Sequence, residues 1–213
     1  MGKRRAGGGK IYGIPHSSAS VLIIDPATNT ADTTTITGLS GTDKWVGGVL
    51  ASNGKIYGIP RASASVLIID PTTNTADTTT IAGLSGSDKW WGGVLAGNGK
   101  IYGMPFNMGS VLIINPSTNT VDTTTITGLS TGSYKWTHSI LAGSGKIYAL
   151  PLNSASVLII DPTTNATDTT TITGLNEQNK WLGGVLAGNG RIYGIPSYSA
   201  SVLTIQCLGA GGF

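Results

Sequence analysis

The side chains with the clearest chemical potential form a lysine–tryptophan pair that recurs along the sequence. Each pair follows an aspartate, a tyrosine or an asparagine, and the four copies are Asp43-Lys44-Trp45, Asp88-Lys89-Trp90, Tyr134-Lys135-Trp136 and Asn179-Lys180-Trp181. An indole can stack on the face of a sugar ring, while the polar side chains beside it can form hydrogen bonds with the sugar hydroxyls. The pattern therefore predicts carbohydrate-binding sites that repeat along the chain.

The same tryptophans also have a structural interpretation. A residue that is kept in every copy of a repeat serves the shared scaffold, so each of these indoles could be a wedge buried between neighbouring units. We favour this interpretation for the four tryptophans that follow lysine. Trp91 is different, because the equivalent positions hold Val46, Thr137 and Leu182. The repeat does not require Trp91, which joins the predicted ligand-binding residues.

Two sets of loops differ between the copies, whereas the turns at the other end of each unit are nearly constant. One set lies between the second and third predicted strands of a unit, and the other connects one unit to the next. Variable loops on a constant scaffold are typical of a binding surface, although loops also drift when nothing packs on them. The remaining predicted ligand-binding residues come from the first set: Arg61, Asn107, Asn153 and Tyr198.

Residues for catalysis or metal binding are scarce. The two histidines, His16 and His138, stand at different positions of different units, so they form neither a repeated ligand set nor an evident acid–base pair. The sequence has no Cys/His cluster, no phosphate-binding loop and no Asp-rich metal loop. We therefore expect a protein that is not an enzyme, without catalytic residues, metal or cofactor.

A repeat of about 45 residues must position all these side chains. The tyrosines of its Ile-Tyr motif follow one another at steps of 45, 45, 46 and 45, at Tyr12, Tyr57, Tyr102, Tyr148 and Tyr193. Such a period, in a chain without helical periodicity, is typical of β-propeller blades. We predict one all-β propeller domain over residues 1–213, with four-stranded antiparallel blades in units of about 1–44, 45–89, 90–135, 136–180 and 181–213.

The third unit shows the four strands that we expect, at residues 91–96, 100–104, 110–114 and 121–126. Asn98-Gly99 predicts a type I′ hairpin turn between the first two strands. The apolar run Val111–Ile114 predicts a third strand that is covered on both faces. The β-branched hydroxyl residues that follow Asp122 suit an outer, solvated strand.

Composition agrees with a chain of many turns and short buried strands, since glycine occurs 32 times and charged residues make up only 11%. The net charge of +3 equals the contribution of Lys3, Arg4 and Arg5, so the sequence gives little reason to expect nucleic acid or a membrane as a partner. The single Cys207 excludes an intrachain disulfide. We find neither a signal peptide nor a membrane span, which leaves the compartment open with the cytoplasm as the default.

The two ends depart from the repeat. Arg4 and Arg5 align with the valine and leucine of the innermost strand, and Gln206-Cys207 replaces the Asp-Pro or Asn-Pro of other units. We therefore expect incomplete first and last blades, and we favour a closed ring of five blades. A second form of closure would move residues 31–36 into the last blade, giving four full blades and a loose hairpin at residues 10–25. A third would exchange this hairpin between chains and so complete the end blades, so that the protein is a monomer or an oligomer.

The segment Trp181–Pro196, with its tryptophan, apolar strand, Asn-Gly turn and aromatic-bearing strand, is similar to the blades of tachylectin-type five-bladed propellers. The second half of each blade, as in Val66–Thr75, looks more like generic propeller repeats of the quinoprotein and NHL type. The tachylectin resemblance covers nearly the whole chain in blade layout, and it implies recognition of amino sugars by loops between blades.

These observations predict a lectin-like binding module, with one weak carbohydrate site in each groove between blades and avidity from repetition. The alternative is a structural or protein-binding propeller scaffold without a small-molecule ligand, either designed or part of a larger repeat array.

Overall fold

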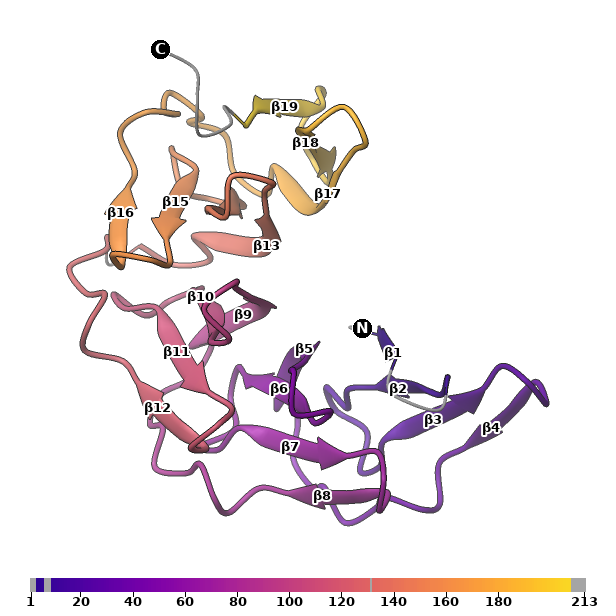
Figure 1. The fold of residues 1–213 in the computed structure, drawn as a ribbon. Coiled ribbons are helices and arrows are strands. Elements are labelled where there is room, and N and C mark those ends of the chain that lie inside the picture. Colours follow the sequence, from indigo (N-terminus) through magenta and orange to yellow (C-terminus); the bar gives the residue numbers. More distant parts are fainter. Residues whose placement is uncertain (1–2, 6–8, 131, 208–213) are drawn as a thin grey trace.

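The structure is a computed structural model that describes residues 3–5, 9–130 and 132–207. Its strands form five antiparallel sheets, and each sheet consists of consecutive strands in chain order. The sheets stand side by side as propeller blades, with the first strand of each blade on the concave side of an arc and the last strand at the periphery (Figure 1). The predicted all-β propeller of five blades with partial end blades is confirmed: among the described residues, the inner strand of the first blade has three residues where that of the second has six, and the last blade has three strands.

The first four blades have four strands each, and the fifth has three among the described residues. Blade 1 contains β1 (Lys3–Arg5), β2 (Ile11–Gly13), β3 (Leu22–Asp25) and β4 (Thr30–Asp32). Blade 2 contains β5 (Trp45–Leu50), β6 (Ile56–Pro60), β7 (Leu67–Asp70) and β8 (Thr75–Asp77). Blade 3 contains β9 (Trp90–Leu95), β10 (Ile101–Pro105), β11 (Leu112–Asn115) and β12 (Thr120–Asp122). Blade 4 contains β13 (Trp136–Leu141), β14 (Ile147–Pro151), β15 (Leu158–Asp161) and β16 (Ala166–Asp168). Blade 5 contains β17 (Trp181–Leu186), β18 (Arg191–Pro196) and β19 (Leu203–Gln206).

The hydrophobic core is divided into layers between neighbouring blades. In β7, Leu67 packs in the layer shared with blade 1, while Ile68 packs in the layer shared with blade 3. The third strand is therefore covered on both faces, as predicted. The inner strands also approach closely: a Cβ placed on Gly48 would lie 2.7 Å from Ile14 of blade 1. Glycine at this position lets one blade seat against the next.

Two expected local structures are different in the protein. The fourth strand of the third unit ends at Asp122 and does not continue to Ile126, because the Asp122 carboxylate accepts hydrogen bonds from the amides and hydroxyls of Thr124 and Thr125. The predicted type I′ turn is wrong: only Gly99 has a positive φ, of 77°, and the amide of Ala96 donates to Lys100 across Gly97–Gly99. This is a three-residue hairpin loop with glycine in the left-handed position.

The hairpin loops such as Gly97–Gly99, together with turns such as Pro116–Asn119, form one face of the arc, which we name the turn face. Here a tyrosine of each of blades 1, 2 and 3 reaches the turn of the next blade. The hydroxyl of Tyr57 donates to Asn119 Oδ1 at 2.6 Å, and that of Tyr102 donates to Asn165 Oδ1 at 2.8 Å. This contact joins consecutive blades and explains why the turns repeat with little change.

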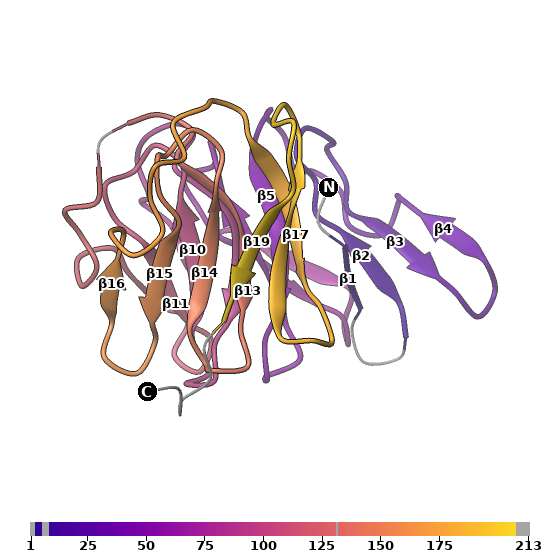
Figure 2. The same cartoon turned by 90° about the horizontal axis from the view of Figure 1, so that it is seen from above.

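Among the described residues, the arc remains open between blade 5 and blade 1 (Figure 1). Figure 2 shows the strands from a second side, running between the two ends at which the loops and turns lie. Ile195 of blade 5 is 52% exposed, whereas the equivalent Ile59 of blade 2 is fully buried. The expected closed ring of five blades is therefore wrong for a single chain. The second form of closure is also wrong, since β4 pairs with β3 in its own blade. The first blade does have an inner strand, β1, in which Arg4 pairs with Tyr12 as Val49 pairs with Tyr57.

Candidate functional site

The face opposite the turn face carries the loops after each second strand and the connectors before each first strand, and we name it the loop face. All the sequence-predicted ligand-binding residues lie on these loops, on these connectors or at the start of the strand that follows. The structure separates them into a buried repeated set, a single surface cluster and a few residues that belong to neither.

The four lysines of the repeated pairs are buried and bind the backbone. Lys135 Nζ donates to the carbonyl oxygens of Phe106, Met108 and Gly132, at 3.3, 3.0 and 2.9 Å. Lys44, Lys89 and Lys180 make the same kind of contact with the loop of the preceding blade. Burial lowers the pKa of Lys135 to about 8, and it lowers the pKa of the other three lysines as well. Each ammonium therefore ties a connector to the preceding loop.

The four tryptophans that follow these lysines are also buried, between 1% and 4% exposed. Each indole nitrogen donates to the carbonyl of the serine that precedes the third strand; the Trp90 Nε1 to Ser110 O distance, for example, is 2.9 Å. Trp90 packs in the layer between blades 2 and 3 beside Ile59 and Leu112. The structure thus places these indoles as wedges between blades, and that of Trp45 also contributes to the walls of the two pockets described below.

A polar cluster lies where blades 1, 2 and 3 meet on the loop face. Arg61 is at its centre: its Nε donates to Asp88 Oδ1 at 2.5 Å, and its Nη1 lies 3.0 Å from His16 Nε2 and 3.4 Å from Asp43 Oδ1. His16 Nε2 is also 3.1 Å from Asp43 Oδ1. The side chains of His16 and Asp43 are 39% and 49% exposed, so a ligand can reach them.

Three aromatic rings continue this cluster toward blade 4. The guanidinium of Arg61 lies 5.2 Å from the centre of the Trp91 ring, within the range of a cation–π contact. Phe106 packs against Trp91 on one side and Tyr134 on the other, with both pairs of ring centres 4.7 Å apart. Phe106 is buried, whereas Tyr134 is 40% exposed. We name His16, Asp43, Arg61, Asp88, Trp91, Phe106 and Tyr134 the loop-face cluster.

The backbone helps to present the connector residues of this cluster. Asp43, Asp88 and Tyr134 have positive φ angles of 52°, 48° and 55°. Aspartate tolerates the left-handed region, but a bulky residue adopts it at a cost of about 1–3 kcal/mol. The ring contact between Tyr134 and Phe106 is one of the interactions that hold Tyr134 in this conformation.

A pocket of about 580 Å³ opens beside the cluster. His16 and Trp91 contribute to its wall, together with Pro15 and the serines Ser17 and Ser18. This volume lies within the range of small-molecule sites, and the wall combines apolar surface with a few polar groups, as such sites do.

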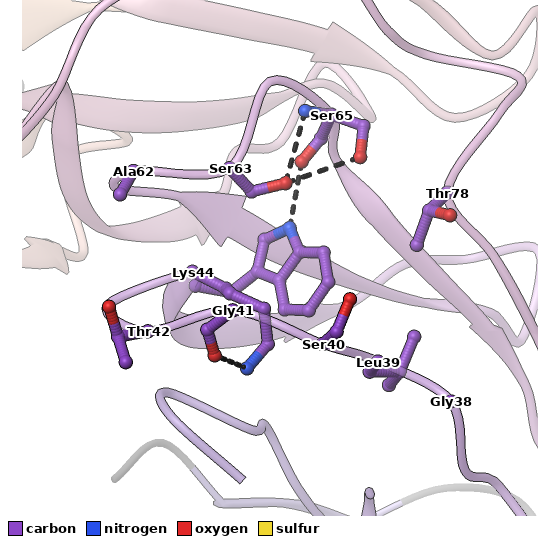
Figure 3. A pocket seen from close by; sticks show the side chains of 11 residues that line it. Gly38, Leu39, Ser40, Gly41, Thr42, Lys44, Ala62, Ser63, Ser65 and Thr78 are labelled. Carbon is purple, nitrogen blue, oxygen red and sulfur yellow. Dashed lines mark hydrogen bonds between the residues drawn. The ribbon is translucent and has the colours of Figure 1, made fainter. Parts of the chain in front are cut away.

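A smaller groove of about 320 Å³ lies between the connector of blade 1 and the loop of blade 2 (Figure 3). Ser63 and Ser65 form one side of it, and Ser40 and Leu39 lie on the other (Figure 3). Lys44 and Trp45 contribute to its wall, but their polar atoms are engaged with Gly41 O and Ser65 O at 2.6 and 2.7 Å. The hydroxyls of the serines, and those of Thr42 and Thr78, are further polar groups that could meet a ligand there.

The other predicted residues lie apart from the cluster or have structural contacts. Asn107 Oδ1 accepts a hydrogen bond from the amide of Tyr134, and Asn153 Oδ1 accepts one from the amide of Asn179, both at 2.8 Å. Tyr198 is 83% exposed on the loop of blade 5.

Two members of the cluster, His16 and Phe106, were not among the predicted ligand-binding residues. They share one sequence position with Arg61, since each directly follows the proline that ends the second strand's motif, at Pro15, Pro60 and Pro105. Their shared position with Arg61 could have identified His16 and Phe106 as candidate ligand-binding residues. The contacts of Arg61 with connector residues of two different units could be seen only in the structure.

In the described ranges, no three His, Cys, Asp or Glu side chains lie close enough together to hold a metal ion. No helix within the described part of the chain is long and apolar enough to cross a bilayer.

Comparisons with known proteins support the fold. No family model and no curated protein matches the sequence. Virginiamycin B lyase from Staphylococcus aureus matches with a TM-score of 0.73 at 12% identity, over 96% of this chain and 69% of that chain. Hydrazine synthase from Kuenenia stuttgartiensis matches with a TM-score of 0.70 at 14% identity, over 96% and 62% of the two chains. An auxiliary nutrient binding protein from Bacteroides ovatus matches with a TM-score of 0.65 at 12% identity, over 90% and 55%.

Identities this low show the fold alone. Enzymes and a binding protein are among these neighbours, so the propeller does not by itself choose between catalysis and binding. The resemblance to tachylectin-type propellers holds for the propeller fold, and the comparisons give no support for that particular family.

Proposed function

We propose that this protein is a non-catalytic, lectin-like module that binds carbohydrate at the loop-face cluster. The observation that carries the proposal is the position of Arg61, which joins two carboxylates and an indole beside a pocket of about 580 Å³. Carboxylates accept hydrogen bonds from sugar hydroxyls, a guanidinium donates them, and an indole offers an apolar ring face. These chemical groups complement the hydroxyls and the apolar face of a sugar ring.

The proposed site differs from one weak site in every groove between blades. The repeated lysines and tryptophans support the loops, while Asp43, Arg61, Asp88, Trp91 and Tyr134 from the predicted set contact the ligand, with His16 beside them. Since other units lack this combination, we propose one principal site per chain. The groove in Figure 3 is a secondary position, where the serine hydroxyls would bind a neighbouring sugar unit.

The charges favour a particular class of sugar. The carboxylates of Asp43 and Asp88 are 49% and 24% exposed, whereas the guanidinium of Arg61 is 18% exposed and the nearby ammonium of Lys89 is buried, so a ligand meets carboxylate oxygens more readily than cationic groups. Uronic and sialic acids would meet like charge, while neutral or amino-bearing sugars would not. We therefore propose neutral or amino sugars as ligands.

A glycan array followed by calorimetric titration with the best-bound glycan tests the proposal. Arg61→Ala and Trp91→Val should each weaken binding at least tenfold, because each removes a direct contact with the sugar. Tyr198→Ala is the matched control, since Tyr198 is also exposed on the loop face and alanine already occupies the equivalent position 62. An array without any bound glycan, probed with folded protein, would reject the proposal.

Catalysis is the second candidate, and one observation favours it. His16 Nε2 lies 3.1 Å from Asp43 Oδ1 beside the pocket, and a carboxylate at this distance can orient an imidazole for proton transfer. Virginiamycin B lyase shows that this fold can carry an enzyme. Mass spectrometry of the bound glycan after prolonged incubation separates the two functions: an unchanged glycan supports binding, whereas turnover that His16→Gln abolishes would establish catalysis.

A further inference from the structure

The groove between blades 1 and 2 (Figure 3) has an equivalent place between blades 2 and 3. Both are built from the connector before a blade and the loop after the second strand of that blade. Much of the wall is the same in the two places, as in the pairs Leu39 and Leu84, Trp45 and Trp90, and Ser65 and Ser110. The two places therefore invite a direct comparison of what fills them.

The main difference is one loop residue, which is Ser63 in blade 2 and Met108 in blade 3. A Cβ placed on Gly86 would lie 4.0 Å from Met108 Sδ, and Met108 packs against the core layer between blades 2 and 3. A Cβ placed on the equivalent Gly41 would meet only the Lys44 side chain within 4 Å, among the described residues. The methionine chain thus fills a space that serine leaves as a groove.

This difference indicates the shape of the missing occupant. Methionine is unbranched and flexible, and its thioether chain fills irregular gaps between packed elements. The groove has a volume of about 320 Å³, which accommodates such a chain together with part of the molecule that carries it. The indole of Trp45 and the side chain of Leu39 give the wall its apolar part. A short unbranched carbon chain complements this surface.

The wall also offers a hydrogen-bond donor at the side of the loop. Ser63 Oγ lies 3.3 Å from Ser65 Oγ, and it accepts a hydrogen bond from the Ser65 amide at 3.2 Å. The pair uses one of its two hydroxyl hydrogens in the contact between the oxygens, so the other hydrogen can be donated to a ligand. A carbonyl oxygen at the head of the chain accepts it. The complementary group is therefore an acyl chain.

The groove adjoins the loop-face cluster on two segments of the chain. Thr42 of the groove directly precedes Asp43 of the cluster, and Ala62 of the groove directly follows Arg61. Consecutive Cα atoms lie about 3.8 Å apart, so neighbouring units of one glycan can reach both places. The acyl chain and the sugar in the cluster can therefore belong to the same ligand.

We propose that the groove between blades 1 and 2 binds a short unbranched acyl group, of the length of a methionine side chain, on the sugar unit next to the one in the loop-face cluster. This inference rests on the proposed function, because the sugar carries the acyl group. It makes Ser63 a specificity-determining residue: serine opens the groove, and methionine at the same position closes it.

Two isomeric probes test the shape without requiring the glycan. Butanamide has an unbranched acyl chain, and 2-methylpropanamide has the same atoms with a branch. Proton–nitrogen correlation NMR of the full chain follows the assigned indole signals during titration. Butanamide should shift the Trp45 signal saturably, because this indole lines the groove. The branched isomer should bind more weakly, since the space filled by Met108 at the next junction is that of an unbranched chain.

A reciprocal exchange of the two loop residues localises the response. Ser63→Met should abolish the shift of Trp45, whereas Met108→Ser should open the equivalent groove and add a saturable shift of Trp90. Ser154→Met is the matched control, because it makes the same substitution at the equivalent position of blade 4 and should leave the Trp45 response unchanged. The dispersion of the indole signals verifies that each variant is folded.

Two results would overturn the inference: a wild-type Trp45 signal that butanamide does not shift, or a folded Ser63→Met variant that responds like the wild type. Its failure can be separated from that of the proposed function. Glycan binding that Arg61→Ala weakens, without any response to butanamide, would keep the carbohydrate site and reject the acyl groove. A response to butanamide without any bound glycan would establish acyl binding in the groove and reject the carbohydrate function.

Discussion

The turn face and the loop face lie at opposite ends of the same strands, but the contacts on the turn face recur between blades, whereas those of the loop-face cluster occur once. On the turn face, the Tyr102 hydroxyl of blade 3 donates to Asn165 Oδ1 of blade 4, and the same pair recurs between other neighbouring blades. On the loop face, Arg61 contacts His16, Asp88 and Trp91 in an arrangement that the other units lack. Contacts between blades keep one face constant, and buried lysines allow the other to vary.

The lysines make this difference possible because they bind only main-chain carbonyls. Lys135 Nζ, for example, donates to the carbonyl oxygens of residues 106 and 108 and does not contact their side chains. These hydrogen bonds are therefore compatible with any residue type at the two positions. A loop held in this way keeps its shape while its side chains change. The comparison therefore predicts that substitutions in the scaffold alter stability, while substitutions in the loop-face cluster alter binding.

The largest effect is expected at a wedge. Trp90→Ala would open a cavity in the layer between blades 2 and 3 and leave Ser110 O without its indole donor, which should lower the free energy of unfolding by about 3–5 kcal/mol. Urea unfolding followed by circular dichroism measures this loss. A change below about 1 kcal/mol would mean that the tryptophan is not a structural wedge.

The opposite behaviour is expected at the neighbouring tryptophan. Trp91→Val introduces the residue that unit two already has at position 46, so the free energy of unfolding should change by no more than about 0.5 kcal/mol. Glycan affinity should fall roughly tenfold, which corresponds to about 1.4 kcal/mol of lost stacking. Titration and unfolding of the same protein sample would separate the two effects. Equal affinities for the variant and the wild type would remove Trp91 from the site.

A smaller effect on stability is expected on the turn face. Tyr102→Phe removes the hydroxyl that joins blade 3 to Asn165 of blade 4, and it should lower the free energy of unfolding by about 1–2 kcal/mol. Tyr193→Phe is the matched control, because the Tyr193 hydroxyl contacts Asn189 of its own blade at an exposed position. If both variants lose the same stability, the contact between blades is not what the tyrosine provides.

Much of the fold could be predicted from the sequence because the same strand and turn signals occur in each repeat. The Ile-Tyr step of 45 residues, the apolar third strands and the defects at Arg4 and Gln206 indicated five blades with partial ends. Closure could not be predicted in the same way, since it depends on how far each blade turns relative to the last. Only the structure shows the rotation from one blade to the next.

The site was less predictable for a related physical reason. Repetition drew attention to the lysine–tryptophan pairs, which the structure buries as wedges and backbone ligands. The loop-face cluster occurs once, so repetition could not indicate it. Its members come from three blades. Arg61 and Asp88 are 27 positions apart in the sequence, and they meet because the loop of blade 2 and the connector that follows this blade lie side by side.

The smallest expected effect concerns the buried lysines and follows from proton linkage. Burial lowers the pKa of Lys135 to about 8 in the folded protein, while the unfolded chain keeps the ordinary value of 10.5. Between these two pH values the unfolded chain binds more protons than the folded protein, so the free energy of unfolding should rise with pH in that window. Lys44, Lys89 and Lys180 should act in the same direction, since burial lowers their pKa values too.

Urea unfolding at several pH values between 7.5 and 9.5 measures this slope, below the range in which tyrosines ionise. Lys135→Met is the test variant: it lacks the titrating group, so its unfolding free energy should rise less steeply with pH than that of the wild type. Lys146→Met, at an exposed position of the hairpin loop in blade 4, is the control for a general loss of positive charge. Parallel slopes for all three proteins would mean that Lys135 stays fully protonated in its carbonyl cage, and that the loop is held by a permanent charge.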